Sequence, residues 1–159
     1  TTVQLDGALS RCGQRGCLEA YLADYARASQ AATALDHDPT MASNPQATLE
    51  AVYQQAKSGH KAAETIFRRA GRSLSRGLCN VVQLFDPALI ILSGERMQYD
   101  YLYAQTVLDE MQKMTLNEGR KPCEVAIHAW GDLVWARGAA ALALSNVTDT
   151  LIGGEARTP

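Results

Sequence analysis

Residues 10–19 of the chain read SRCGQRGCLE, and the interpretation of the whole sequence starts from this stretch. It contains two cysteines, Cys12 and Cys17, that enclose two glycines, and Glu19 follows where a helical pattern begins. Because glycine adopts backbone conformations that other residues resist, the stretch predicts a tight loop. The cysteines can hold that loop through a metal, a disulfide or simple packing. The Glu19 carboxylate is predicted to face whatever the loop encloses.

The loop leaves two alternatives open. Cys12 and Cys17 have a spacing compatible with zinc, but a structural zinc site usually takes four ligands, so free thiols are the other interpretation. Cys79 and Cys123 fall in a predicted helix and a predicted strand, and neither is an obvious further ligand. Glu19 can bind a polar ligand, or it can be a carboxylate that the helix dipole favours at a helix start.

The composition is that of a soluble globular domain with a real core. The chain has 159 residues, of which 47% are hydrophobic and 20% charged, and a formal net charge of −2, which gives no support for a surface that binds polyanions. Four cysteines without a secretion signal favour a cytoplasmic, reducing location. No apolar run approaches the roughly 18 residues of a membrane span, so we expect no membrane partner. Since the chain begins at Thr1, we expect the C-terminal part of a longer protein.

Hydrophobic periodicity predicts a helix-rich α/β fold with few strands. Predicted helices cover residues 18–35, 45–57, 63–85, 97–115 and 133–146, and predicted strands cover residues 89–92 and 123–130. The first strand is apolar throughout and is expected to be buried on both faces. The last helix is likewise expected to be buried. Residues 1–150 are therefore predicted to form one compact domain, and residues 151–159 a disordered tail.

Other candidate sites are weaker. Ser93 and Gly94 follow the first predicted strand, where open α/β sheets tend to bind ligands. A basic ridge on the helix 63–85 suggests either a nucleic-acid contact or, as the favoured interpretation, a solvated helix face. This ridge consists of Arg68, Arg69, Arg72 and Arg76. The three histidines form no pattern typical of a catalytic triad.

Residues 12–19 resemble the signature Cys-x-Cys-Gly-x-x-Gly-Cys-Leu-Glu of the ROK family, which groups repressors, open reading frames and sugar kinases. The similarity continues in order through residues 86–94 and 131–142. It implies part of the C-terminal lobe of an actin-like ATPase (RNase H-like) fold.

The resemblance also implies roles for individual residues. Glu19 matches a glutamate that binds sugar hydroxyls in the family. Three motif cysteines and an upstream histidine bind zinc there; Cys12 and Cys17 carry over, Ser10 replaces the first cysteine, and the histidine would precede Thr1. The nucleotide-site Gly-Gly of the family is matched by Ser93 and Gly94. Zinc is therefore a possible cofactor, and ATP is not expected to bind this part alone.

Three functions follow as hypotheses. The favoured one, because the zinc and nucleotide motifs have drifted, is the sugar-effector-binding and dimerisation region of a ROK-type transcriptional regulator. Such a protein would contact DNA only through a helix-turn-helix outside this chain and would form a homodimer. The alternative is the C-terminal lobe of an ATP-dependent ROK sugar kinase, with the catalytic aspartate in the missing part. The third is a helical interaction module with inert cysteines.

Overall fold

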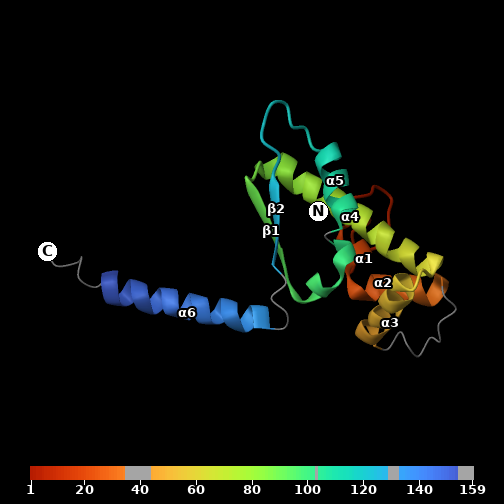
Figure 1. Cartoon of the computed structure of the whole chain (residues 1–159), viewed down its shortest axis with the longest axis horizontal. Coiled ribbons are helices and arrows are strands. Elements are labelled where there is room, and N and C mark those ends of the chain that lie inside the picture. Colours follow the sequence, from red (N-terminus) through yellow and green to blue (C-terminus); the bar gives the residue numbers. More distant parts are fainter. Residues whose placement is uncertain (35–43, 103, 129–132, 154–159) are drawn as a thin grey trace. The chain divides into compact units, whose positions relative to one another are not determined.

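The computed structural model describes residues 1–34, 44–102, 104–128 and 133–153, and it has the helix-rich α/β composition that the sequence predicts (Figure 1). The chain divides into two compact units. The first comprises residues 1–90 and 99–125, and the second comprises residues 91–98 and 126–159.

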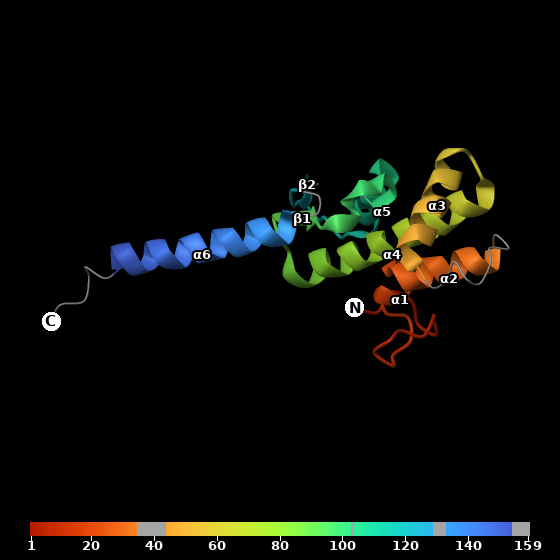
Figure 2. The same cartoon turned by 90° about the horizontal axis from the view of Figure 1, so that it is seen from below.

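The first unit is organised around the long helix α4 (Lys61–Phe85). Four other helices pack against it or against one another: α1 (Glu19–Leu22), α2 (Asp24–Ala34), α3 (Pro45–Lys57) and α5 (Gln105–Met114) (Figure 2). Apolar residues of α4 that recur at helical spacing, such as Ile66, Ala70 and Leu74, are buried, as predicted.

The ends of α3 and α4 confirm the local signals in the sequence. The Asn44 side chain accepts a hydrogen bond from the Ala47 backbone N–H at 3.2 Å, and Pro45 occupies the first helical position. Gly59 follows α3 with φ of 90°. The left-handed backbone of Asp86, with φ of 44°, ends α4 immediately before Pro87.

The single helix predicted over residues 18–35 is wrong, because the chain leaves helical geometry at Ala23. That residue has ψ of 146° and separates α1 from α2. Its N–H bonds to the Glu19 carbonyl and closes α1, while its own carbonyl accepts from the N–H groups of Ala26 and Arg27. At the start of α2, the buried Arg27 side chain donates a hydrogen bond to the Asp24 carboxylate at 2.8 Å and forms an ion pair with it.

The helix predicted over residues 97–115 is also too long. It consists of two 3-10 turns, η2 (Glu95–Gln98) and η3 (Asp100–Leu102), followed by α5. Tyr99 lies between the two turns and is fully buried in the core with Phe67 and Leu49. Ala104 is extended just before α5, with ψ of 141°. Burying Tyr99 therefore takes precedence over a continuous helix.

The two predicted strands pair as β1 (Leu89–Ser93) and β2 (Glu124–His128). The expected burial of β1 on both faces is wrong, since Leu89 is 47% and Ile91 57% exposed while Ile90 and Leu92 are half-buried. Among the described residues the sheet has only two strands, so alternate side chains have nothing to pack against. The end of the second predicted strand, residues 129–130, lies outside the described residues.

Helix α6 (Val134–Gly153) belongs to the second unit. Its expected burial is wrong: Trp135, Leu142 and Leu151 are all more than 70% exposed. Besides α6, the described part of its unit contains only residues 91–98, 126–128 and 133, which is too little to cover an apolar helix. The helix continues three residues past position 150, into the predicted tail, and residues 154–159 and the predicted cap at 131–132 lie outside the described residues. None of the helices described is long and apolar enough to cross a membrane.

Candidate functional site

The cysteine loop, residues 8–17, is the tight turn that its glycines predict. The Gly16 N–H bonds to the Ala8 carbonyl at 2.9 Å, and the Ser10 N–H bonds to the Gln14 carbonyl at 2.9 Å. A further bond from the Gly13 N–H to the Ser10 carbonyl, at 3.0 Å, closes the turn. Gly16 is required by the geometry, because its φ is 73° and an added Cβ would lie 1.6 Å from the Gln4 carbonyl oxygen.

The loop brings Ser10 against Glu19. The Ser10 side chain is only 4% exposed, and its hydroxyl donates to Glu19 Oε2 at 2.5 Å. Glu19 is the first residue of α1 and is exposed. The sequence pointed to Glu19 but not to this partner. The one feature of the sequence that could have pointed to the Ser10–Glu19 hydrogen bond is that a serine, which can donate a hydrogen bond, stands where the ROK signature has a cysteine.

The two loop thiols face each other. The Sγ atoms of Cys12 and Cys17 are 3.6 Å apart; Cys12 is exposed and Cys17 partly exposed. Hydrogen bonds to the Ser10 hydroxyl and, next, the Gln14 backbone lower the pKa of the Cys12 thiol. The pKa of Cys17 is raised, first by its hydrogen bond with Cys12 and then by desolvation.

The described residues of the chain do not complete a zinc site. Two thiolates on one tetrahedral zinc are about 3.8 Å apart, so the pair alone would fit. However, the parts of the chain that the structure describes contain no group of three or more His, Cys, Asp or Glu side chains that could hold a metal. Ser10, which stands where the family motif has its first cysteine, is hydrogen-bonded to Glu19. The zinc prediction thus retains two candidate ligands out of four.

Ser93 and Gly94 belong to the second unit. The Ser93 hydroxyl donates to the His128 backbone carbonyl at 3.3 Å, so it links the ends of β1 and β2. Gly94 has φ of 136°, and an added Cβ would meet no atom within 4 Å. The space beside the Gly94 backbone is therefore not filled by other described residues, whereas the Ser93 hydroxyl is used in a hydrogen bond between the two strands.

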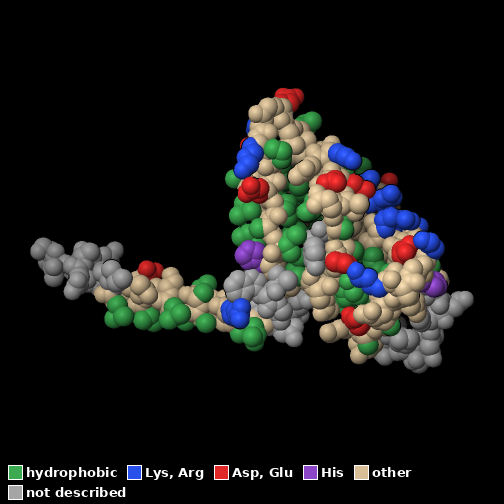
Figure 3. All heavy atoms as spheres, in the orientation of Figure 1, with side chains coloured by type: hydrophobic (Ala, Val, Ile, Leu, Met, Phe, Trp, Pro, Cys, Tyr) green, Lys and Arg blue, Asp and Glu red, His purple; other side chains and the backbone are tan. Residues whose placement is uncertain are grey.

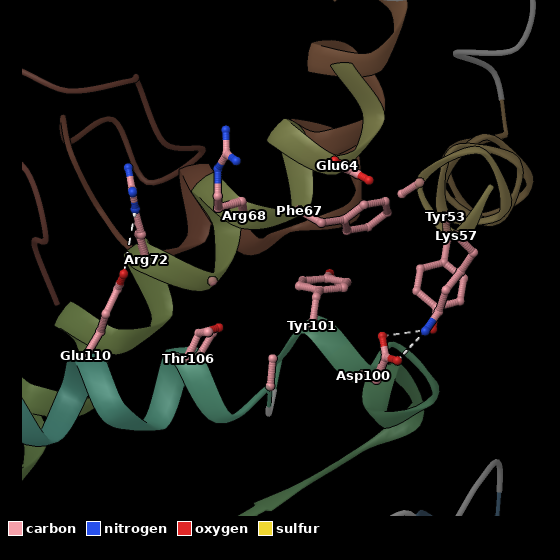
Figure 4. Close-up of a pocket in the computed structure, with 14 residues that line it drawn as sticks. Tyr53, Lys57, Glu64, Phe67, Arg68, Arg72, Asp100, Tyr101, Thr106 and Glu110 are labelled. Atoms are coloured by element: carbon pink, nitrogen blue, oxygen red, sulfur yellow. Dashed lines mark hydrogen bonds and ion pairs between the residues drawn. The ribbon is translucent and has the colours of Figure 1, made fainter. Parts of the chain in front are cut away.

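A hollow that the sequence did not reveal lies between α3, α4, η3 and α5 (Figure 4). It has a volume of about 380 Å³, and the rings of Tyr53, Phe67 and Tyr101 line one side of it. The Phe67 and Tyr101 ring centres are 4.5 Å apart, and Tyr53 meets Phe67 edge-on at 5.7 Å. Tyr53, Phe67 and Tyr101 come from three separate segments, so only the fold brings them together.

One edge of this hollow is polar. Lys57 forms an ion pair with Asp100, and the Tyr53 hydroxyl donates to Asp100 Oδ1 at 3.0 Å. The hydrogen bond from Lys57 holds the pKa of Asp100 below its usual value, whereas desolvation, followed by the bond to Asp100, raises the pKa of Tyr53. At the other end, Arg72 lies 3.8 Å from Glu110. The arrangement suits a flat apolar group with a polar edge.

The arginine ridge on α4 is exposed, as predicted for a solvated helix face. Figure 3 shows Lys and Arg side chains gathered over this helix. Arg69, Arg72 and Arg76 also line a second hollow of about 430 Å³.

A comparison with protein families matches residues 1–146 to the ROK family. The chain belongs to the ROK family. This confirms the resemblance of the cysteine motif and of the later segments. The ROK hexokinase from Thermus thermophilus is similar with a TM-score of 0.73 and 24% identity, over 94% of this chain and 47% of the hexokinase.

A ROK glucokinase from Streptomyces griseus, solved in complex with glucose and AMPPNP, is similar with a TM-score of 0.64 and 26% identity, over 89% of this chain and 49% of that one. The ROK chain described here therefore spans about half the length of both kinases. Its fold corresponds to part of the C-terminal lobe of their actin-like ATPase fold, as predicted.

Proposed function

We propose that this chain is the sugar-binding and dimerisation region of a ROK-type transcriptional regulator, in which Glu19 accepts hydrogen bonds from sugar hydroxyls. The observation that carries the proposal is the hydrogen bond from the buried Ser10 hydroxyl to Glu19 Oε2. It orients the carboxylate before a ligand arrives, which lowers the cost of ordering it. Among the described residues Oε1 has no hydrogen-bond donor, so it can accept from a sugar.

Two serines favour a regulator over a kinase. Ser10 stands where the family signature has a cysteine, and Ser93 where it has a nucleotide-site glycine. Both hydroxyls are used within the protein, by Glu19 and by the His128 carbonyl. A kinase must keep its nucleotide site, whereas a regulator needs only to bind the sugar and transmit binding to its DNA-binding domain. The sugar achieves this through a different affinity for two arrangements of the protein.

The second candidate is the C-terminal lobe of an ATP-dependent sugar kinase. Its support is that both similar structures are kinases, one of them solved with glucose and AMPPNP. In that case Glu19 positions the hydroxyls, and an aspartate outside this chain takes the proton.

Sugar binding tests the role of Glu19. We expect Glu19→Gln in the intact protein to weaken hexose binding about ten- to hundredfold, because a hydrogen bond to a charged group contributes about 1.5–3 kcal/mol. Calorimetry with glucose and a panel of other hexoses measures this. Glu124→Gln is the matched control, since Glu124 is exposed and bonded to Lys121. If the unmodified protein, Glu19→Gln and Glu124→Gln bind hexoses with equal affinity, the proposal is contradicted. The helical interaction module with inert cysteines would then be the remaining hypothesis.

Two further assays separate regulator from kinase. A regulator should change its affinity for its operator DNA when the hexose is added. A kinase should instead convert the hexose to its phosphate ester when ATP and magnesium are supplied. Hexose phosphorylation by the intact protein without any hexose effect on DNA binding would replace the first candidate by the second.

A further inference from the structure

The cysteine loop holds two thiols at a distance suited to a covalent bond between them. Their Sγ atoms are 3.6 Å apart, and a disulfide has a length of about 2.05 Å, so closure needs a movement of about 1.5 Å. Both Sγ atoms sit on a loop whose backbone hydrogen bonds already bring its two sides together.

Access distinguishes this pair from the other two cysteines. Cys12 is exposed and Cys17 partly exposed, whereas Cys79 and Cys123 are buried, at 5% and 7% exposure. A soluble oxidant therefore reaches the loop pair first. Among the described residues no third His, Cys, Asp or Glu side chain groups with the pair as a metal site, and Ser10 is hydrogen-bonded to Glu19.

We propose that Cys12 and Cys17 form a reversible disulfide by exchange with a small-molecule disulfide such as oxidised glutathione. The Cys12 thiolate attacks one sulfur of the small molecule and releases the first thiol, which leaves a mixed disulfide on Cys12. The Cys17 thiolate then attacks the Cys12 sulfur and releases the second thiol. The protein loses two protons and two electrons, and one small disulfide becomes two thiols.

The proposed Cys12–Cys17 disulfide is expected to restrain the neighbouring Glu19 carboxylate. Ser10 precedes Cys12 by two residues and donates to Glu19, so a cross-link from Cys12 to Cys17 restrains the segment that orients this carboxylate. We expect the oxidised protein to bind a hexose several-fold more tightly than the reduced protein. This consequence rests on the proposed sugar-binding role of Glu19, but formation of the disulfide does not.

Tryptic digestion reports the bond directly, because Arg11 and Arg15 place the two cysteines on different peptides, residues 12–15 and 16–27. The intact protein is equilibrated with mixtures of reduced and oxidised glutathione, alkylated and digested. We expect the two peptides to appear as one linked species that separates on reduction, in most molecules when oxidised glutathione predominates. Cys12→Ser and Cys17→Ser should abolish that species, and Cys79→Ser should not change it.

Other results overturn the proposal. One is a glutathione adduct that stays on Cys12 without closing. Another is one zinc per chain, with thiols that react only after a chelator removes it. If the linked species forms but glucose affinity is unchanged, the effect on Glu19 is wrong. If Glu19→Gln also leaves glucose binding unchanged, the failure lies in the proposed function.

Discussion

Gly16 and Gly13 lie in the same loop with similar backbones, at φ of 73° and 83°, but only Gly16 is crowded. An added Cβ at Gly16 would collide with the Gln4 carbonyl, whereas at Gly13 it would meet open space. We expect Gly16→Ala to lower the free energy of unfolding by about 2–3 kcal/mol, and Gly13→Ala by about 1 kcal/mol from the left-handed backbone alone. Urea unfolding of both variants measures the difference. Equal losses would mean that the loop shifts to admit the methyl group.

At the scale of residues, the sequence was informative where the pattern is local. The spacing of Cys12, Gly13, Gly16 and Cys17 was enough to predict the tight loop, because the left-handed backbone that both glycines adopt is a local property. The contact that excludes a side chain at Gly16 comes from Gln4, earlier in the chain, and the spacing does not reveal it. The partnership of Ser10 with Glu19 was not predicted, since a serine at a cysteine position first suggests a lost metal ligand.

At the scale of elements, Asp100 joins the 3-10 turn η3 to helix α3 through Lys57 and Tyr53. The lowered pKa of Asp100 means that its stabilising effect is present above its unfolded-state pKa and is lost as the pH falls through its lower folded-state pKa. Both charged groups are about half exposed, so we expect Asp100→Asn to cost only about 0.5–1 kcal/mol at pH 7.

This cost should shrink progressively as unfolding is measured at pH values further and further below the unfolded-state pKa of aspartate, which is about 3.9. Asp109→Asn is a suitable control, because the one hydrogen bond that Asp109 accepts within the described residues comes from Gln105 on the same helix. A cost for Asp100→Asn that stayed constant down to acidic pH would show that the ion pair is not its source.

Elements whose ends carry their own signals were predicted to within two residues. Asn44 and Pro45 begin α3, and Asp86 ends α4, through interactions within one turn. The break at Ala23 was missed because no glycine or proline marks it in the sequence. The 3-10 turns before α5 were missed because Tyr99, which lies between them, is buried in a core with residues far away in the sequence. The aromatic hollow was missed for the same reason, since Tyr53, Phe67 and Tyr101 are adjacent only in the fold.

At the scale of the whole molecule, the resemblance predicted that the chain is part of a larger fold, and the chain spans about half of each similar kinase. The expected burial of β1 and α6 was wrong for a related physical reason. An apolar pattern indicates that a segment needs a partner, but it does not say that the partner is contained in the same 159 residues.

The exposed apolar side chains of α6 predict self-association. Leu142 and Leu151 are 78% and 72% exposed, and surfaces of this kind mark interaction sites. We expect the 159-residue chain to form dimers, and Leu142→Lys with Leu151→Lys to weaken dimerisation at least about tenfold, since burying each leucine contributes about 1.5–3 kcal/mol. Asn146→Lys with Thr150→Lys adds the same charge without removing apolar surface and should have a smaller effect. Light scattering after size exclusion measures the mass of each protein. A chain that is monomeric before any substitution would contradict the prediction, and equal weakening by the two double variants would assign the effect to charge.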